Sequence, residues 1–174
     1  VTGELIARLI DKNQSIVVSS QTHEAINNLL KSVQRNAQSL SSTPFVVKLS
    51  SGTSEKSDQR SLSGTKVQAL RENDLNSKPN VLGATVFSLV KERFGEKPYD
   101  LLVVDEAGQV SLSNLLFMSH CARNILLVGD QNQLSQPNRA KHPGESGLSC
   151  LEYVMGEEKV VPFNKGVFLA TSWR

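Results

Sequence analysis

Two apolar runs in this chain each end abruptly at a carboxylate. Residues 101–104 are followed by Asp105 and Glu106, and residues 125–128 are followed, after one glycine, by Asp130. A run that is apolar at every position is typical of a strand buried on both faces of a parallel sheet. Ligands of such sheets bind just beyond the carboxyl ends of the strands. The pattern therefore predicts a chemical site at this edge.

Adjacent Asp and Glu side chains at a strand end suit nucleotide hydrolysis. In that chemistry the carboxylate of Asp105 holds Mg²⁺, and Glu106 orients or deprotonates the attacking water. The side-chain amide of Gln133 can donate to or accept from a γ-phosphate. The alternative for a lone Asp-Glu pair is the start of a solvated loop, and the alternative for Asp130 is turn formation or helix capping. The presence of a second acidic strand end favours a nucleotide site over these alternatives.

Apolar strand-like runs alternate with helical patterns along the chain. Such alternation predicts right-handed crossovers and an α/β fold, with a mostly parallel sheet and helices on both faces. We expect strands at residues 15–19, 45–49, 80–85, 101–105, 125–129 and 167–170, and helices near residues 1–10, 22–33, 87–93, 111–118 and 148–154. The Ser-rich segment 50–78 is the least regular, with one helix expected around residues 67–72.

Size and composition indicate one domain of an intracellular protein. The chain has 174 residues, 39% of them hydrophobic, which suffices for one core. Its net charge of +2 neither requires nor excludes nucleic acid, because a phosphate-binding surface needs only a local basic patch. Cys121 and Cys150 lie in apolar patterns, as buried reduced thiols do. No apolar stretch is long enough to span a bilayer, so we expect no membrane partner.

Both acidic strand ends resemble known motifs. The sequence Asp-Glu-Ala-Gly-Gln at residues 105–109 resembles motif II of superfamily 1 helicases, and residues 129–134 resemble motif III. The group most resembled moves 5′-to-3′ and contains the nonsense-mediated-decay RNA helicase and the Okazaki-fragment nuclease–helicase. Residues 135–147 are similar to bacterial members, some of which carry a nuclease domain; a bacterial member would be cytoplasmic.

This resemblance implies a RecA-like P-loop NTPase fold, the first of two such domains in a helicase that uses ATP and Mg²⁺ to move along or unwind DNA or RNA. The implied partners are a single strand, the second RecA-like domain and possibly a fused nuclease domain. The resemblance gives Asp105 as the metal ligand and Glu106 as the catalytic carboxylate. The other implied catalytic or nucleotide-binding residues are Gln109, Gly129, Asp130, Gln133 and Arg174, the last at the start of a motif IV-like sequence.

The 174 residues contain no G-x-x-x-x-G-K-[ST] phosphate-binding loop. In the family this loop directly precedes a helix that resembles residues 1–10. We therefore expect residues 1–174 to be a fragment of the first RecA-like domain, truncated at both ends and inactive alone. In the family, a small helical subdomain is inserted where segment 50–78 lies, so we expect a reduced or partly disordered version here.

Residues 19–29 resemble motif Ia, in which a strand end and a helix start bind a nucleic-acid phosphate. The free N–H groups and hydroxyl at a helix start suit that role. The resemblance implies contacts from Thr22 and His23, and from Thr85 at the motif Ic threonine. The alternatives are a plain N-cap for Thr22 and Thr85 and a surface helix residue for His23.

Two other functions remain open from the sequence. The parent protein could be a nucleic-acid-dependent ATPase switch that does not unwind, or a degenerate scaffold without catalysis. The carboxylates of Asp105 and Glu106, together with Gln133, argue against the scaffold.

Overall fold

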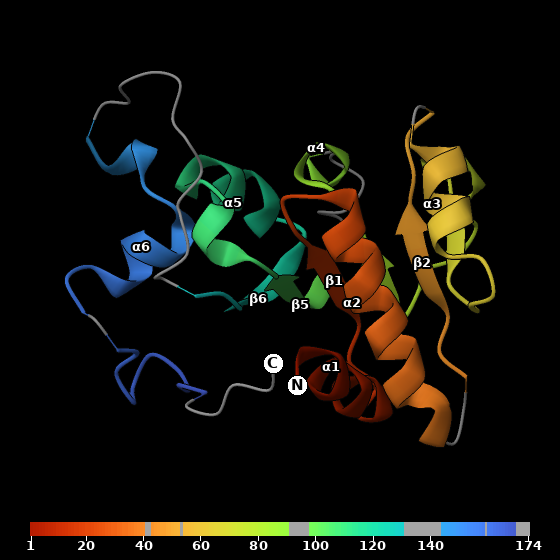
Figure 1. The fold of residues 1–174 in the computed structure, drawn as a ribbon, viewed down its shortest axis with the longest axis horizontal. Coiled ribbons are helices and arrows are strands. Elements are labelled where there is room, and N and C mark those ends of the chain that lie inside the picture. Colours follow the sequence, from red (N-terminus) through yellow and green to blue (C-terminus); the bar gives the residue numbers. More distant parts are fainter. Residues whose placement is uncertain (41–42, 53, 91–97, 131–143, 159, 170–174) are drawn as a thin grey trace.

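The computed structural model describes residues 1–40, 43–52, 54–90, 98–130, 144–158 and 160–169. A six-stranded sheet, parallel at every pairing, forms the centre of the molecule in the order β3-β2-β4-β1-β5-β6 (Figure 1). This sheet confirms the predicted α/β fold with a RecA-like arrangement. The strands are β1 (Ile16–Ser19), β2 (Val46–Leu49), β3 (Gln68–Leu70), β4 (Val81–Gly83), β5 (Tyr99–Val104) and β6 (Ala122–Leu127).

Helices cover both faces of the sheet. On one face α1 and α2 pack side by side (Figure 1), and α3 packs against α2. The opposite face carries α4, α5 and α6. The bounds are α1 (Thr2–Asp11), α2 (His23–Asn36), α3 (Glu55–Ser61), α4 (Val86–Leu89), α5 (Leu112–Ser119) and α6 (Cys150–Met155), with 3₁₀ turns η1 (Ala37–Ser39), η2 (Glu72–Asp74), η4 (Ala107–Gln109) and η5 (Gly144–Gly147).

The two faces bury separate apolar clusters because successive strand residues point to opposite sides. In β1, Val17 packs with the α4–α6 cluster, whereas Ile16 and Val18 pack with the α1–α2 cluster. All three are fully buried, as expected for a central strand. No helix within the described residues is long and apolar enough to cross a membrane.

Strand β6 departs from the expectation that its apolar run is buried on both faces. Its residues are half-buried or exposed, and Ile125 is 42% exposed. The reason is its position, since within the described part of the chain β6 pairs with β5 alone and forms the edge of the sheet. An apolar run predicts burial only when neighbours lie on both sides.

The strand expected at residues 167–170 is wrong for residues 167–169, which have no assigned secondary structure and exposed side chains. A strand needs a neighbour to satisfy its N–H and C=O groups, and no described strand lies beside this segment. Ala170 lies outside the described residues.

Segment 50–78, expected to be a reduced or partly disordered insertion, contains α3, β3 and η2 in its described part. The helix expected around residues 67–72 is wrong, because residues 68–70 form β3 and pair in parallel with β2. The helix lies earlier, at α3, and Leu62 and Val67 after it are buried in the α1–α2 cluster.

Candidate functional site

The predicted catalytic carboxylates lie at the carboxyl end of β5. The backbone N–H of Asp105 donates to the carbonyl of Ser19 at 2.9 Å, so the ladder with β1 extends to this residue. At Glu106 the backbone turns into the left-handed region, with φ 54° and ψ 41°. Residues other than glycine adopt this conformation uncommonly, and it ends the strand abruptly before η4.

The two loops that follow β5 and β6 are in backbone contact. The N–H of Ala107 donates to the carbonyl of Val128 at 2.9 Å. A Cβ atom on Gly108 would lie 3.0 Å from the carbonyl oxygen of Asp130, and one on Gly129 would lie 3.0 Å from the nitrogen of Ala107. Glycine at both positions permits this approach. The structure thus brings the backbones of the two predicted motifs together at Ala107 and Gly108 of one and Gly129 and Asp130 of the other.

The charges of Asp105 and Glu106 are crowded. Burial raises the pKa of the Asp105 carboxyl, and the neighbouring charge of Glu106 raises it further, against a lowering backbone hydrogen bond. The hydroxyl of Ser20 donates to Oε2 of Glu106 at 3.4 Å. The ionised form of Asp105 is therefore disfavoured, and a bound cation would relieve that cost.

This donor set fits Mg²⁺ held mainly by a nucleotide. Among the described residues no group of three or more His, Cys, Asp or Glu could enclose a metal ion. Mg²⁺ is commonly held by one or two carboxylates, with water and substrate phosphates completing its shell. Asp105, whose pKa is raised by burial and by the charge of Glu106, suits that single anchoring role.

The motif II loop is held from the α6 side by contacts that the sequence reasoning did not anticipate. The thiol of Cys150 donates to the carbonyl of Ala107 at 3.2 Å, and its backbone N–H donates to the carbonyl of Val110 at 2.7 Å. Ser149 and Glu152 form a capping box at the start of α6. The Ser-x-x-Glu spacing is the signal that could have predicted this cap. Burial raises the pKa of the Cys150 thiol to about 11, as expected of a structural thiol.

The other predicted nucleotide-site residues are placed as follows. Gln109 lies half-buried in η4, and its backbone N–H donates to the carbonyl of Glu106 at 2.8 Å. Gly129 and Asp130 are exposed after β6. Gln133 and Arg174 lie outside the described residues.

The predicted nucleic-acid residues follow β1 and β4, which are adjacent strands. Thr22 is the N-cap of α2, and its hydroxyl oxygen accepts from the N–H of Ala25 at 3.1 Å. Thr85 is the N-cap of α4 without a capping hydrogen bond, and its hydroxyl lies 3.2 Å from that of Ser88. Both therefore lie at the same carboxyl edge of the sheet as Asp105.

His23 begins α2 and lies above a buried polar cluster. Its Nδ1 is 3.3 Å from Nζ of Lys48, which is fully buried in β2. Asp58 of α3 accepts hydrogen bonds from Asn27 at 3.0 Å and Ser50 at 2.7 Å. Sequence reasoning missed this cluster because Lys48 lies within an apolar strand and Asp58 within the segment expected to be irregular.

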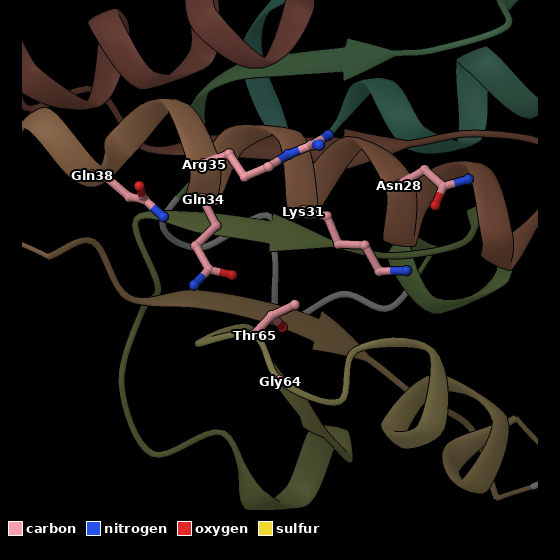
Figure 2. A pocket seen from close by; sticks show the side chains of 7 residues that line it. All are labelled: Asn28, Lys31, Gln34, Arg35, Gln38, Gly64 and Thr65. Atoms are coloured by element: carbon pink, nitrogen blue, oxygen red, sulfur yellow. The ribbon is translucent and has the colours of Figure 1, made fainter.

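A separate cavity of about 500 Å³ lies between α2 and the loop after α3 (Figure 2). Its lining includes Lys31 and Arg35 with the amide side chains of Asn28, Gln34 and Gln38, and it includes no carboxylate. None of the predicted site residues lines it. The candidate carboxylates Asp105 and Glu106 therefore lie outside this cavity.

The chain is similar to known proteins along most of its length. Residues 6–136 match the model of the family described as AAA domain. The DNA replication ATP-dependent helicase/nuclease DNA2 of Xenopus laevis is 27% identical over 137 residues, which are 78% of this chain and 13% of that protein. Its counterpart in Schizosaccharomyces pombe is 26% identical over 163 residues, 90% of this chain and 11% of that protein.

The chain thus spans only a small part of the length of the relatives it matches. The family match covers both strand ends that carry the candidate carboxylates, as well as the start of α2. The chain belongs to the AAA domain family and is superfamily 1 helicase-like.

Proposed function

We propose that this chain is part of the first RecA-like domain of an ATP-dependent helicase, which couples ATP hydrolysis to movement along DNA or RNA. The observation that carries the proposal is the meeting of the loops after β5 and β6. There Ala107 and Gly108, which directly follow Asp105 and Glu106, meet the backbone of residues 128–130 at the carboxyl edge of a parallel sheet. Nucleotides bind at this edge in open α/β folds.

The two carboxylates have separate roles in this proposal. Asp105 anchors the Mg²⁺–nucleotide, and Mg²⁺ supplies neutralisation of phosphate charge when bound. Glu106 orients the attacking water and accepts its proton. Its left-handed backbone turns the chain directly after Asp105, and Ser20 donates to its carboxylate. Gln133 and Arg174 belong to the same proposed site, which they would complete at the γ-phosphate.

We further propose that the phosphate-binding loop lies N-terminal to α1, at the end of a strand that pairs with β6. The side of the sheet on which that strand lies follows from the handedness of the crossovers. The chain passes from β1 to β2 through α2, and α1 lies on the same face as α2. Because such crossovers are right-handed, a strand before α1 must lie on the opposite side of β1 from β2. Strands β5 and β6 occupy the first positions on that side, which leaves the position beyond β6.

This placement explains the exposed apolar run of β6 and puts the missing loop beside Asp130. A phosphate-binding loop at the end of that strand would lie at the same edge as Asp105. The fragment organisation, with residues 1–174 as part of one domain, is the proposal that accounts for both features.

The nucleic-acid strand is proposed to cross the carboxyl edge at Thr22, His23 and Thr85. The strands that these residues follow, β1 and β4, lie on the far side of β5 from β6. Nucleotide and nucleic acid would thus occupy neighbouring parts of one edge. Because the similar proteins are named as DNA replication helicase/nucleases, we also propose an intracellular setting, a second RecA-like domain and a nuclease domain in the longer protein.

Glu106→Gln in the longer protein that contains this domain tests the catalytic assignment. The amide keeps the side chain's shape and loses its basicity, so nucleic-acid-stimulated ATP hydrolysis should fall by roughly 10²-fold or more while ATP affinity changes little. Phosphate release and equilibrium binding of a fluorescent ATP analogue measure the two quantities.

Glu157→Gln, on the exposed turn after α6, is the matched control and should behave as the wild type. Equal hydrolysis by Glu106→Gln and wild type would refute the assignment. A wild-type protein that neither binds nor hydrolyses ATP would instead support the scaffold alternative.

A further inference from the structure

A buried ion pair lies beneath the first turn of α2. Lys48 of β2 and Asp58 of α3 are 0% and 1% exposed, and Nζ lies 3.6 Å from Oδ2. Removing two charges from water costs several kcal/mol per ion unless further hydrogen bonds compensate. The proposed nucleotide chemistry uses neither residue, so the pair needs another explanation.

Both oxygens of Asp58 are already occupied by neutral donors. Oδ1 accepts from the side-chain amide of Asn27 at 3.0 Å, and Oδ2 accepts from the hydroxyl of Ser50 at 2.7 Å. Lys48 therefore directs its shorter contacts elsewhere. It donates to the carbonyl of Leu49 at 2.6 Å and lies 3.3 Å from Nδ1 of His23.

With Lys48 in its charged form, its contact with Nδ1 of His23 favours one imidazole tautomer. An ammonium group has three donors and no acceptor, so Nδ1 must present its lone pair to Lys48. In a neutral ring the proton then resides on Nε2. The distance from Nδ1 to Asp58 is 3.6 Å, longer than the contact with Lys48. The side chain of His23 is 42% exposed, and no hydrogen bond joins Nε2 to the described residues.

We propose that Lys48 and Asp58 are positioning residues for His23, which hold its ring so that Nε2–H donates to a phosphate of a bound single strand. This inference rests on the proposed function. His23 directly follows Thr22 at the carboxyl edge, where the free N–H groups of α2 attract anions. The buried ammonium of Lys48 adds positive potential beneath the same turn. Burial lowers the pKa of Lys48, and the charge of Asp58, 3.6 Å away, opposes that lowering and holds the ammonium in place.

The experiment compares two substitutions that each preserve one end of the imidazole. His23→Asn keeps an acceptor near the position of Nδ1 and loses the reach of Nε2. His23→Gln places its amide near the position of Nε2. With a labelled oligo(dT) and a matching oligo(U) in fluorescence anisotropy, we expect roughly tenfold weaker binding for His23→Asn, as for loss of one charge-assisted hydrogen bond. His23→Gln should bind within about threefold of wild type.

Imidazole ¹⁵N spectroscopy of the wild-type chain reports the tautomer of His23, and so tests the positioning of its ring independently of nucleic-acid binding. We expect the Nε2–H tautomer. In Lys48→Met the tautomer should shift toward Nδ1–H, because Asp58 becomes the nearest partner. If Lys48→Met unfolds, the tautomer of wild-type His23 and the binding of the two His23 variants still test the inference.

If His23→Asn binds the oligonucleotides as tightly as the wild type does, the inference is overturned while the proposed function stands. A wild-type His23 ring with its proton on Nδ1 would have the same consequence. Absence of oligonucleotide binding by the wild-type chain would contradict the proposed nucleic-acid function, and the inference would fall with it.

Discussion

Asp105 and Glu106 combine an unusual backbone conformation with neighbouring like charges. Glu106 has a left-handed φ of 54°, and the pKa of Asp105 is raised by burial and by the charge of Glu106. Features of this kind persist where the surrounding structure enforces them, and they concentrate at functional sites. Here the enforcing contacts come from β1, from the loop after β6 and from Cys150.

Asp105→Asn should therefore stabilise the folded chain while removing the proposed metal ligand. The gain should be on the order of 1 kcal/mol, typical of relief at a functional site. Thermal unfolding followed by circular dichroism at pH 7 measures it, with Glu157→Gln as the surface control. A less stable Asp105→Asn variant would contradict the idea that this carboxylate is strained.

The pH dependence of that difference has a defined sign. Because the folded-state pKa of Asp105 is raised, the folded chain binds its proton more readily than the unfolded chain. The wild type should lose stability relative to the variant as pH rises above about 4, the ordinary carboxyl range. Near pH 3 the two stabilities should converge.

At the residue scale, chemistry that is local in sequence could be predicted, and chemistry assembled from distant segments could not. The position of Asp105 and Glu106 after a strand follows from the apolar run. The N-cap alternative for Thr22 also follows from its place before a helix, and the structure shows that cap. The left-handed turn at Glu106 depends on the neighbouring loop. Lys48 gave no signal because it lies within an apolar strand.

Among the elements, the apolar pattern predicted every strand of the sheet except β3, wrongly predicted one at residues 167–169, and did not reveal how the strands are surrounded. The runs at β5 and β6 look alike in sequence, yet β5 lies between two strands and β6 at the edge. Nothing in a single run records how many neighbours it has. Segment 50–78 illustrates a second limit, since α3 has few apolar residues and is joined to α2 through the polar contacts of Asp58.

Asp58→Asn should test how strongly that polar contact holds α3. The substitution leaves the buried ammonium of Lys48 without a countercharge, which typically costs about 3–5 kcal/mol. Chemical denaturation measures the loss. Glu55→Gln on the same helix is the control, because its pair with Arg71 is more exposed and such pairs contribute about 0–1 kcal/mol.

A double-mutant cycle with Lys48→Met separates the pair from the rest of the cluster. Removing both charges should cost less than the sum of the single changes. The pKa of Asp58 is lowered, because hydrogen bonds from Ser50 and Asn27 and the charge of Lys48 outweigh burial, which raises it. Its contribution is therefore present above the ordinary carboxyl pKa and is lost as pH falls below about 4. Additive costs in the cycle would show that the two charges do not interact.

In the whole molecule, one layered fold places two candidate surfaces on a single edge. The crossovers through α2 and α3 extend the sheet in one direction, and those through α4 and α5 extend it in the other. The sequence predicted this alternation and the α/β class. It could not predict the strand order, which depends on the face that each helix occupies.

Hydrogen exchange of the β6 amides tests the proposal that a strand N-terminal to α1 pairs with β6. The N–H of Val128 donates to Val104, and alternation along a parallel strand then directs the N–H groups of Ile125 and Leu127 toward the open side. In the 174-residue chain these amides should exchange quickly, because no described strand accepts from them.

If a strand N-terminal to α1 pairs with β6 in the longer protein, both amides should exchange at least about 100-fold more slowly there, as ladder amides of a stable sheet do. The amides of β3, at the opposite edge, are the internal control and should exchange at similar rates in both proteins. Unchanged exchange at Ile125 and Leu127, with the longer protein folded, would place the preceding strand elsewhere and remove the structural basis for a phosphate-binding loop beside Asp130.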